Sequence, residues 1–237
     1  MTKASPPRTS LRIASYNLQK CVGLDLRRRP DRSLGVINAL KAQIVVLQEA
    51  DKRLPPRPAA LPHEMAEADG WQVASFGEPG GSLGHHGNAM LLAPGLRLTD
   101  AAHIDLPGLE PRGAIRAELD TPIGPLRVIG AHLGLIRRYR LLQLGAITRH
   151  LRRLPPLPTV LAGDFNEWGS DLAIDAATPG LEFLPARPSF PAPRPVAPLD
   201  RFALSPELRA LAHGNHTAQP ARVASDHLPV WADIALR

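Results

Sequence analysis

Polar side chains stand at the ends of several apolar segments, where packing alone gives them no purpose. The segment TVLAGDFNEW begins as an apolar run and ends in Asp164, Phe165 and Asn166. Other apolar segments end in the same way, and the full set comprises Asn17, Glu49, His132, Asp164, Asn166, Asp226 and His227. Binding residues tend to collect at the ends of rigid strands. If these ends converge, one pocket holds the whole set.

Oxygen donors dominate this set, which favours a hard cation. It contains three carboxylates and two side-chain amides, with no cysteine cluster and no paired histidines at metal spacing. Mg²⁺, or Mn²⁺ as a substitute, prefers such ligands, so zinc is disfavoured. Each residue taken alone is equally typical of a turn or a helix cap. Their joint occurrence at strand ends is what favours chemistry.

The elements that must position these residues are mostly strands, because apolar runs bounded by turn residues recur along the chain. The predicted strands have the sequences LRIASYNL, IVVLQEA, WQVASF, GNAMLLA, GAIRAEL, LRVIGAHL, TVLAGDF, DRFALS and LPVWADIAL. Helical periodicity covers residues 31–42 and, more clearly, 139–154. In the second helix one face, which should pack on a sheet, carries Leu144, Ile147, Leu151 and Leu154. Two proline-rich segments, LPPRPAALP and ARPSFPAPRPVAP, predict loops.

Length and composition predict one domain. The chain has 237 residues and 44% hydrophobic content, enough for one large core. We expect a flexible segment over residues 1–10 and a single domain over residues 11–237. No apolar stretch has the length of a membrane span, and the opening MTKASPPRTS lacks the apolar segment of a secretory signal. We therefore expect a cytoplasmic monomer, in which Cys21, the only cysteine, is a buried thiol.

The charge of the chain leaves the partner open. The formal net charge is +6, and 24 of the 28 basic residues are arginines. The planar guanidinium of arginine suits phosphate, which favours an anionic partner. A GC-rich coding sequence explains the same excess of arginine equally well. Charge alone therefore does not decide between a nucleic acid and another phosphorylated partner.

Seven segments together resemble the signature blocks of a known family, in the order in which that family has them. The segments are SYNLQK, VVLQEAD, GNAMLL, AHLGL, LAGDFNEW, PLDRFALS and SDHLPV. They resemble the endonuclease/exonuclease/phosphatase superfamily, which includes DNase I, exonuclease III and the sphingomyelinases. GHHGNAMLL and HLGL are most similar to its bacterial YbhP-like branch. The resemblance implies an α+β fold, a four-layer α/β/β/α sandwich of two packed mixed sheets flanked by helices.

By the same resemblance, each strand-end residue receives a role in phosphate ester cleavage. Glu49 is the principal metal carboxylate, with Asn17 beside it and Asp226 bound directly or through water. Asp164 orients or deprotonates the attacking water, and Asn166 holds that water or a phosphate oxygen. His227 contacts the phosphate with its ring oriented by Asp200, and His132 binds phosphate or protonates the leaving oxygen. A carboxylate partner is expected to raise the pKa of His227.

Two positions depart from the pattern of the abasic-site repair enzymes in the superfamily. These enzymes tend to have tyrosine where this chain has His132, and some carry an acid where it has Gln19. An abasic-site role and a second strong metal ligand are therefore disfavoured.

Four further residues have a functional and a structural interpretation side by side. Asn88 is either a phosphate ligand or part of the start of a strand, and Arg112 is either a phosphate ligand or a turn residue. His86 is a candidate for the rim of the site, because adjacent side chains such as His85 and His86 point apart in extended backbone. Trp168 either stacks on a base or lipid head or forms a wall.

The sequence thus predicts a Mg²⁺-dependent phosphodiesterase, with nucleic acid slightly favoured as substrate. A hydrolase of phospholipid head groups or small diesters is the alternative, because the superfamily shares its metal site across substrates. A binding module without catalysis is disfavoured, because every expected acid and histidine position is filled. The triplet Arg27, Arg28 and Arg29 either reaches an anionic substrate or keeps a loop solvated.

Overall fold

Two six-stranded sheets lie face to face in the computed structural model, which describes residues 10–52, 57–76, 81–169 and 172–237. The first sheet contains, in spatial order, β11 (Leu208–Asn215), β12 (Val230–Leu236), β1 (Leu11–Asn17), β2 (Ile44–Gln48), β4 (Ala89–Leu92) and β3 (Gln72–Val73). The second contains β5 (Arg97–Asp105), β6 (Gly113–Thr121), β7 (Gly124–His132), β8 (Thr159–Asp164), β10 (Asp200–Leu204) and β9 (Glu182–Phe183). Both sheets are mixed, because β1 and β2 run parallel, as do β7 and β8, whereas the other pairs are antiparallel.

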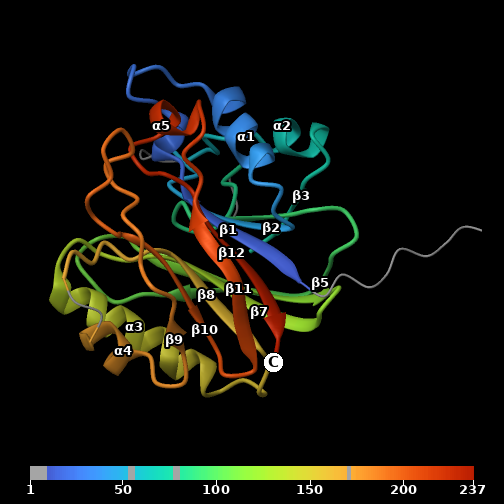
Figure 1. The fold of residues 1–237 in the computed structure, drawn as a ribbon, viewed down its shortest axis with the longest axis vertical. Helices are drawn as coiled ribbons and strands as arrows, with labels where there is room; N and C mark the ends of the chain where they lie inside the picture. The colour runs from blue at the N-terminus through green and yellow to red at the C-terminus, as the bar shows by residue number, and fades with distance from the viewer. Residues whose placement is uncertain (1–9, 53–56, 77–80, 170–171) are drawn as a thin grey trace, which may run out of the picture.

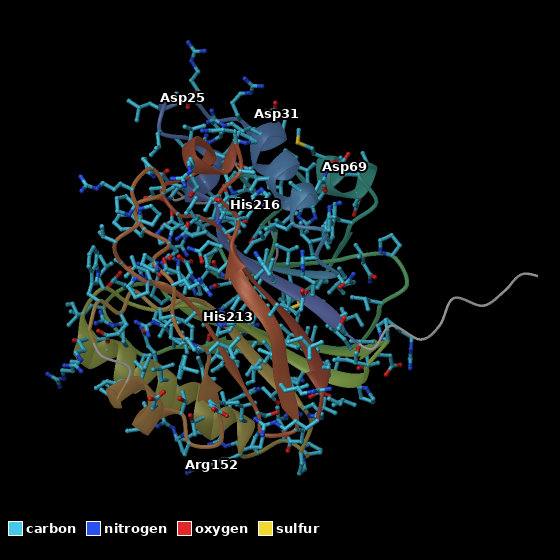
Figure 2. All side chains as sticks on the ribbon, in the orientation of Figure 1. Asp25, Asp31, Asp69, Arg152, His213 and His216 are labelled. Carbon is cyan, nitrogen blue, oxygen red and sulfur yellow. The ribbon has the colours of Figure 1, made fainter. Side chains whose placement is uncertain are left out.

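Helices cover the outer face of each sheet and complete four layers (Figure 1). The first sheet is covered by α1 (Pro30–Ala39), α2 (His63–Ala68) and α5 (Ala221–Ala224), and a short 3-10 helix, η1 (Gln19–Cys21), follows β1. The second sheet is covered by α3 (Arg137–Leu151) and α4 (Leu172–Ala177). Figure 2 shows charged side chains on both outer layers, with Asp31 on α1 and Arg152 just beyond α3. The predicted α+β four-layer sandwich is confirmed.

Because side chains alternate between the two faces of each strand, the buried apolar residues form three separate cores. In β1, Ile13 faces the middle core between the sheets, whereas Ala14 and Tyr16 face the core beneath α1. A third core lies between the second sheet and α3. The sheets approach closely at Gly130, where an added Cβ would lie 2.5 Å from Cγ1 of Val46. A side chain at this position would force the two sheets apart.

Apolar runs in the sequence predicted the central strands of both sheets but not most of the edge strands. All eight inner strands overlap predicted segments, although β6 continues two residues beyond GAIRAEL and β7 begins two residues before LRVIGAHL. The strands β5, β9 and β11 were not predicted, and WQVASF forms only the two-residue β3. The four edge positions belong to β3, β5, β9 and β11. Most residues of β5 and β11 are exposed or half-buried. Strands on an edge need fewer apolar residues, so a search for apolar runs passes over them.

Helix bounds differ from the prediction by a few residues. The predicted helix 31–42 begins one residue earlier and ends at Ala39, because Lys41 has a φ of 52°, which does not continue a right-handed helix. The helix predicted over 139–154 spans Arg137–Leu151, so Leu154 falls outside it. Leu144 and Ile147 are fully buried, as the periodicity predicts. Within the described residues, both proline-rich segments form loops.

Two further predictions concern the flexible segment at the N-terminus and membrane crossing. The predicted flexible segment, residues 1–10, lies outside the described residues except for its last residue. Among the helices that the structure describes, the longest is α3, and none has the length and apolar character that membrane crossing requires.

The thiol of Cys21 is buried, with no exposed surface, and burial raises its pKa to about 11. The thiolate is the reactive form, so we expect Ellman's reagent at pH 8 to label native protein at least about 100-fold more slowly than protein unfolded in urea. The measurement is the labelling rate with and without urea, with free cysteine as the reference. Native labelling at the unfolded rate would contradict the buried position.

Candidate active site

Five strands from both sheets deliver polar side chains to one edge of the sandwich. Asn17 and Glu49 come from the ends of β1 and β2, and His132 and Asp164 from the ends of β7 and β8. Asp200 begins β10. His132 and Asp200 both pair with Asp164 across neighbouring strands, so register alone brings these three together. Asp226 and His227 come from the loop between α5 and β12.

Asp164 lies at the centre of this group. Its carboxylate Oδ2 accepts a hydrogen bond from Asn17 Nδ2 at 3.0 Å, which joins the two sheets. The same oxygen lies 3.5 Å from Nε2 of His132 and 3.7 Å from Nε2 of His227. Burial raises the pKa of Asp164 to about 7, although the positive charge of His227 opposes this shift. A carboxyl group with such a pKa can accept a proton near neutrality.

The backbone around Asp164 fixes its direction. Gly163 has a φ of 151°, and a Cβ there would lie 1.9 Å from the carbonyl oxygen of Ala131. Asn166 donates its backbone N–H to Asp164 Oδ1 at 2.9 Å and its side-chain amide to the Leu133 carbonyl at 2.9 Å. Phe165 points away and is fully buried in the core beneath α3. Phe165 thus packs in a core while Asp164 and Asn166 bond to each other, although Asn166, with a φ of 50°, does not continue the extended strand.

His227 is held by a buried carboxylate. Its Nδ1 lies 2.8 Å from Asp200 Oδ2, which also accepts a hydrogen bond from Ser189 Oγ at 2.6 Å. Burial alone would lower the pKa of His227, but the charge and hydrogen bond of Asp200, together with nearby Asp164 and Asp226, raise it to about 10. The ring is therefore positively charged at neutral pH.

His132 has the opposite electrostatics. An Arg112 Nη1 atom lies 2.7 Å from its Nε2 and 2.9 Å from its Nδ1, and Arg112 also pairs with Glu110 at 2.9 Å. Burial lowers the pKa of His132 well below its usual value, and the positive charges of Arg112, His227 and Lys20 lower it further. His132 is therefore neutral, while His227 on the other side of Asp164 is charged.

Glu49 and Asp226 form the acidic part of the site. Glu49 follows β2 with a φ of 50°, in the left-handed region that few residues other than glycine adopt. Its carboxylate forms an ion pair with Lys20, so it already binds a cation. Burial raises the pKa of Asp226, opposed by the charge of His227 and reinforced by that of Glu49. Two neighbouring carboxylates fit a hard divalent cation, whose charge would offset their repulsion.

Asn17 fits that cation less directly than the two carboxylates. Its Oδ1 accepts the backbone N–H of Gln19 at 3.0 Å, and its amide nitrogen is committed to Asp164. A second candidate metal group consists of Asp164, Asp200 and His227, whose ligand atoms lie within 4.8 Å of one another. Asp200 Oδ2 already accepts two hydrogen bonds, whereas its Oδ1 is buried without a hydrogen-bond partner among the described residues, so Oδ1 is the oxygen that a metal ion in that group could bind without displacing either bond.

A cavity of about 430 Å³ opens beside the site. Four residues predicted from the sequence line it, namely Glu49, His86, Arg112 and His132. The remaining lining residues are Lys20, Asp51, Lys52, Arg57, Gly87, Glu110, Pro111 and Leu135. Of the adjacent histidines, His86 is exposed and lines this cavity while His85 is buried. The two side chains diverge in a turn, where His86 has a φ of 47°, rather than in the extended backbone that the prediction assumed.

Two of the predicted substrate ligands lie outside this cavity. Asn88 is fully buried and donates to the carbonyl oxygen of Gly113 at 2.9 Å, which fits a structural role. Trp168 is 62% exposed, and its ring packs 6.0 Å from that of Phe190, which in turn lies 5.0 Å from the His227 ring. Substrate contacts by these two residues stay predictions.

The arginine triplet lies in the exposed loop before α1. Arg29 pairs with Asp31 at 2.6 Å, and Arg28 donates to the Lys20 carbonyl at 3.2 Å. Arg27 is exposed. The triplet is absent from the lining of the cavity, so its reach toward a substrate stays a prediction.

Three residues of the site were missed by the sequence interpretation. Lys20 stands inside the SYNLQK block, which was the available signal. Glu110 accepts the backbone N–H of Leu135 at 2.8 Å and thereby joins two loops at the cavity. Ser189 holds Asp200 from the proline-rich segment ARPSFPAPRPVAP, for which the sequence predicted a loop but no contact with the site.

Comparisons with known proteins agree with this architecture. The chain is 31% identical over 170 residues to the "Uncharacterized protein YbhP" of Escherichia coli (strain K12), a match that covers 65% of this chain and 64% of the relative. The chain thus spans less than two thirds of the length of this curated relative. The YbhP protein of Shigella flexneri matches to the same extent.

Solved structures share the fold at low sequence identity. The endonuclease/exonuclease/phosphatase of Beutenbergia cavernae DSM 12333 has a TM-score of 0.74 at 23% identity, covering 97% of this chain and 72% of that one. The mannosyl-6-phosphatase Bt3783 of Bacteroides thetaiotaomicron VPI-5482 has a TM-score of 0.76 at 19% identity, covering 96% and 100%. TDP2 of D. rerio, complexed with a single-strand DNA product, has a TM-score of 0.72 at 18% identity, covering 95% and 98%.

The family follows from a match over most of the sequence. The model of the Endonuclease/Exonuclease/phosphatase family matches residues 14–227, a range that contains every residue of the candidate site. With this match, and with the YbhP relative at 31% identity, the chain belongs to the endonuclease/exonuclease/phosphatase family.

Proposed function

We propose that this protein is a Mg²⁺-dependent phosphoesterase that cleaves phosphodiester bonds by attack of water. The observation that carries the proposal is the buried carboxylate of Asp164 between two histidines, one neutral and one charged, beside an open cavity. Hydrolysis of such an ester needs a proton acceptor for the water, positive charge on the phosphoryl oxygens and a donor to the leaving oxygen. The described side chains include a candidate for each.

Each side chain receives one task in this proposal. Asp164 takes a proton from the water as the new P–O bond forms, and Asn166 orients that water or a phosphate oxygen. His227, oriented by Asp200, donates to the phosphate. Neutral His132 donates its N–H toward the leaving oxygen, with Arg112 behind it. As the ester P–O bond breaks, the leaving oxygen takes a proton from solvent and Asp164 returns its own proton to solvent, so one water is consumed for each bond cleaved.

Glu49 and Asp226 would hold the cation, with Asn17 beside them. A bound Mg²⁺, or Mn²⁺ as a substitute, would neutralise charge that develops on the phosphate. The two carboxylates support this assignment because the charge of Glu49 acts on Asp226 and contributes, after burial, to its raised pKa, and a bound cation would relieve this repulsion. We also propose that residues 11–237 act as one domain, because the middle core joins both sheets.

Nucleic acid is the substrate class that we favour. The net charge of +6 and the excess of arginine support an extended anionic partner. Among fold relatives, TDP2 was solved with a DNA product, whereas another is a mannosyl-6-phosphatase. A head-group or small-diester substrate is the second candidate, because the cavity of about 430 Å³ has the size of a small-molecule site.

A substrate panel tests the proposed activity directly. Plasmid DNA, abasic duplex, RNA, bis-p-nitrophenyl phosphate, sphingomyelin and inositol phosphates are each incubated with Mg²⁺ or with EDTA. We expect cleavage of at least one diester in Mg²⁺ and none in EDTA. If none of these substrates is cleaved at saturating Mg²⁺ or Mn²⁺, the proposed activity is refuted.

Substitution of Glu49 should weaken the cation site. Glu49→Gln removes a negative charge that a hard cation needs, so activity should fall at least about 100-fold and recover in part at higher Mg²⁺. The measurement is turnover as a function of Mg²⁺ concentration. Glu64→Gln, the same change at an exposed position on α2, is the matched control and should behave like the parent protein. Full activity of the parent protein or of Glu64→Gln in EDTA would argue against a requirement for a metal ion.

Asp164 and His227 should each matter for turnover rather than for folding. Asp164→Ala and His227→Ala are each expected to lower kcat by at least about 10²-fold, because acid–base and electrostatic effects have this size. The double variant should lose less than the product of the two losses, since residues that act as a unit are not additive. His216→Ala, at a half-buried histidine that directly follows β11 (Figure 2), is the control. A folded Asp164→Ala protein with normal turnover rules out its role.

Salt dependence separates nucleic acid from a small diester. A protein inactivated by His132→Ala and Asp164→Ala should bind duplex DNA with a steep loss of affinity in salt, because each neutralised phosphate contributes roughly 0.9 to the slope of log K against log salt. Replacing Arg27, Arg28 and Arg29 with alanine should make the slope shallower. A flat slope, together with no cleavage of plasmid, abasic duplex or RNA, favours the small-diester candidate instead.

A further inference from the structure

In the structure Lys20 binds Glu49, the carboxylate that the proposed function assigns to the metal cation. Its Nζ forms an ion pair with Oε2 of Glu49, and the two side chains are 30% and 24% exposed. The backbone N–H of Lys20 also donates to the carbonyl oxygen of Glu49 at 3.0 Å. Lys20 is therefore fixed to Glu49 through its main chain as well as through its charge.

The backbone that presents Lys20 adopts an unusual conformation. Gln19, Lys20 and Cys21 have φ values of 47°, 58° and 57°, so three consecutive residues other than glycine lie in the left-handed region. This conformation costs free energy and occurs preferentially where surrounding contacts and function require it. Here the Arg28 side chain donates to the Lys20 carbonyl at 3.2 Å, and Gln19 Oε1 accepts the Asp226 backbone N–H at 3.1 Å. One turn thus contacts both segments that carry the proposed metal carboxylates.

The charge of Lys20 also faces the phosphate side of the site. Lys20 lines the cavity together with Arg112 and His132. If released from Glu49, the ammonium would therefore face the same cavity as His132 and Arg112, where a phosphate could be bound.

A divalent cation and the ammonium compete for the same carboxylate. Both are positively charged, so their simultaneous contact with Glu49 is opposed by repulsion at short distance. The carboxylate of Glu49 gains more from a doubly charged ion, but the ion pair with Lys20 must first be broken. The ion pair therefore lowers the affinity for the cation and offsets the charge of Glu49 when no cation is bound.

We propose that Lys20 is an internal competitor of the divalent cation: its ammonium binds Glu49 in the metal-free protein, leaves when the cation binds, and then contacts a phosphoryl oxygen of the substrate. This inference rests on the proposed cation site at Glu49. Lys20 thus has two successive partners, first the carboxylate of Glu49 and then a phosphoryl oxygen of the substrate. Neither contact requires a change in the fold, because the turn of Lys20 is held by its main chain.

Mn²⁺ binding to the full chain tests the competition without any assay of activity. Free Mn²⁺ is measured by electron paramagnetic resonance for the parent protein, Lys20→Met, Lys20→Arg and Lys52→Met. We expect Lys20→Met to bind Mn²⁺ about three- to fivefold more tightly, which corresponds to the upper part of the range for an ion pair near the surface. Lys20→Arg keeps the charge, and Lys52→Met changes another lysine of the same cavity. The affinity of these two variants for Mn²⁺ should stay within about twofold of that of the parent protein.

Inorganic phosphate tests the second contact. With Mn²⁺ saturating, Lys20→Met should bind phosphate at least about fivefold more weakly than the parent, because a charged hydrogen bond to the anion is lost. Metal affinity and phosphate affinity should therefore change in opposite directions. Circular dichroism at rising temperature verifies folding, and Lys20→Gln replaces Lys20→Met if the latter is unfolded.

The outcomes separate this inference from the proposed function. Equal Mn²⁺ affinity in the parent and in Lys20→Met, with weaker binding to Glu49→Gln, would overturn the competition and leave the cation site in place. Tighter Mn²⁺ binding without any loss of phosphate affinity would overturn the second contact. Absence of Mn²⁺ binding to every protein would overturn both the inference and the proposed cation site.

Discussion

Burial of the Asp164 carboxylate is the constraint on which the rest of the site depends. With 1% of its surface exposed, this acid has lost its water, and an unpartnered charge there would be strongly destabilising. Its partners come from other segments: Asn17 from the first sheet, the backbone of Asn166, and His227 from the loop before β12. Both sheets must therefore keep one relative position for the carboxylate to be satisfied.

Strand register provides that position. Asp164 stands opposite His132 in one neighbouring strand and opposite Asp200 in the other. A slip by one residue would turn each side chain to the opposite face of the sheet. Gly163 makes the close contact with the Ala131 carbonyl possible, because any Cβ there would overlap that oxygen. The same backbone that forms the sheet thus sets the spacing between the acid and the two imidazole rings.

The interior of this fold was predictable from the sequence, and its edges were not. Central strands such as β2 and β8 are fully buried, so their sequences are continuous apolar runs. The edge strand β5 instead exposes or half-exposes eight of its nine residues, with only Ile104 buried. Its pairing with β6 comes from main-chain hydrogen bonds, which any sequence can form. The elements without an apolar signal are therefore those whose stability depends least on their own side chains.

A similar division separates the chemistry of the site from its selectivity. Asp164 and His132 were recognisable because polar residues at the tips of buried strands have no packing purpose, whereas Asp200 was predicted only from the resemblance to the family. The walls of the cavity come instead from loops, where Glu110 binds the backbone of Leu135, 25 residues away. Such contacts leave no periodic pattern, since each joins segments that are unrelated in sequence. The reaction class thus follows from strand ends, whereas the substrate class depends on loop contacts that only the folded chain reveals.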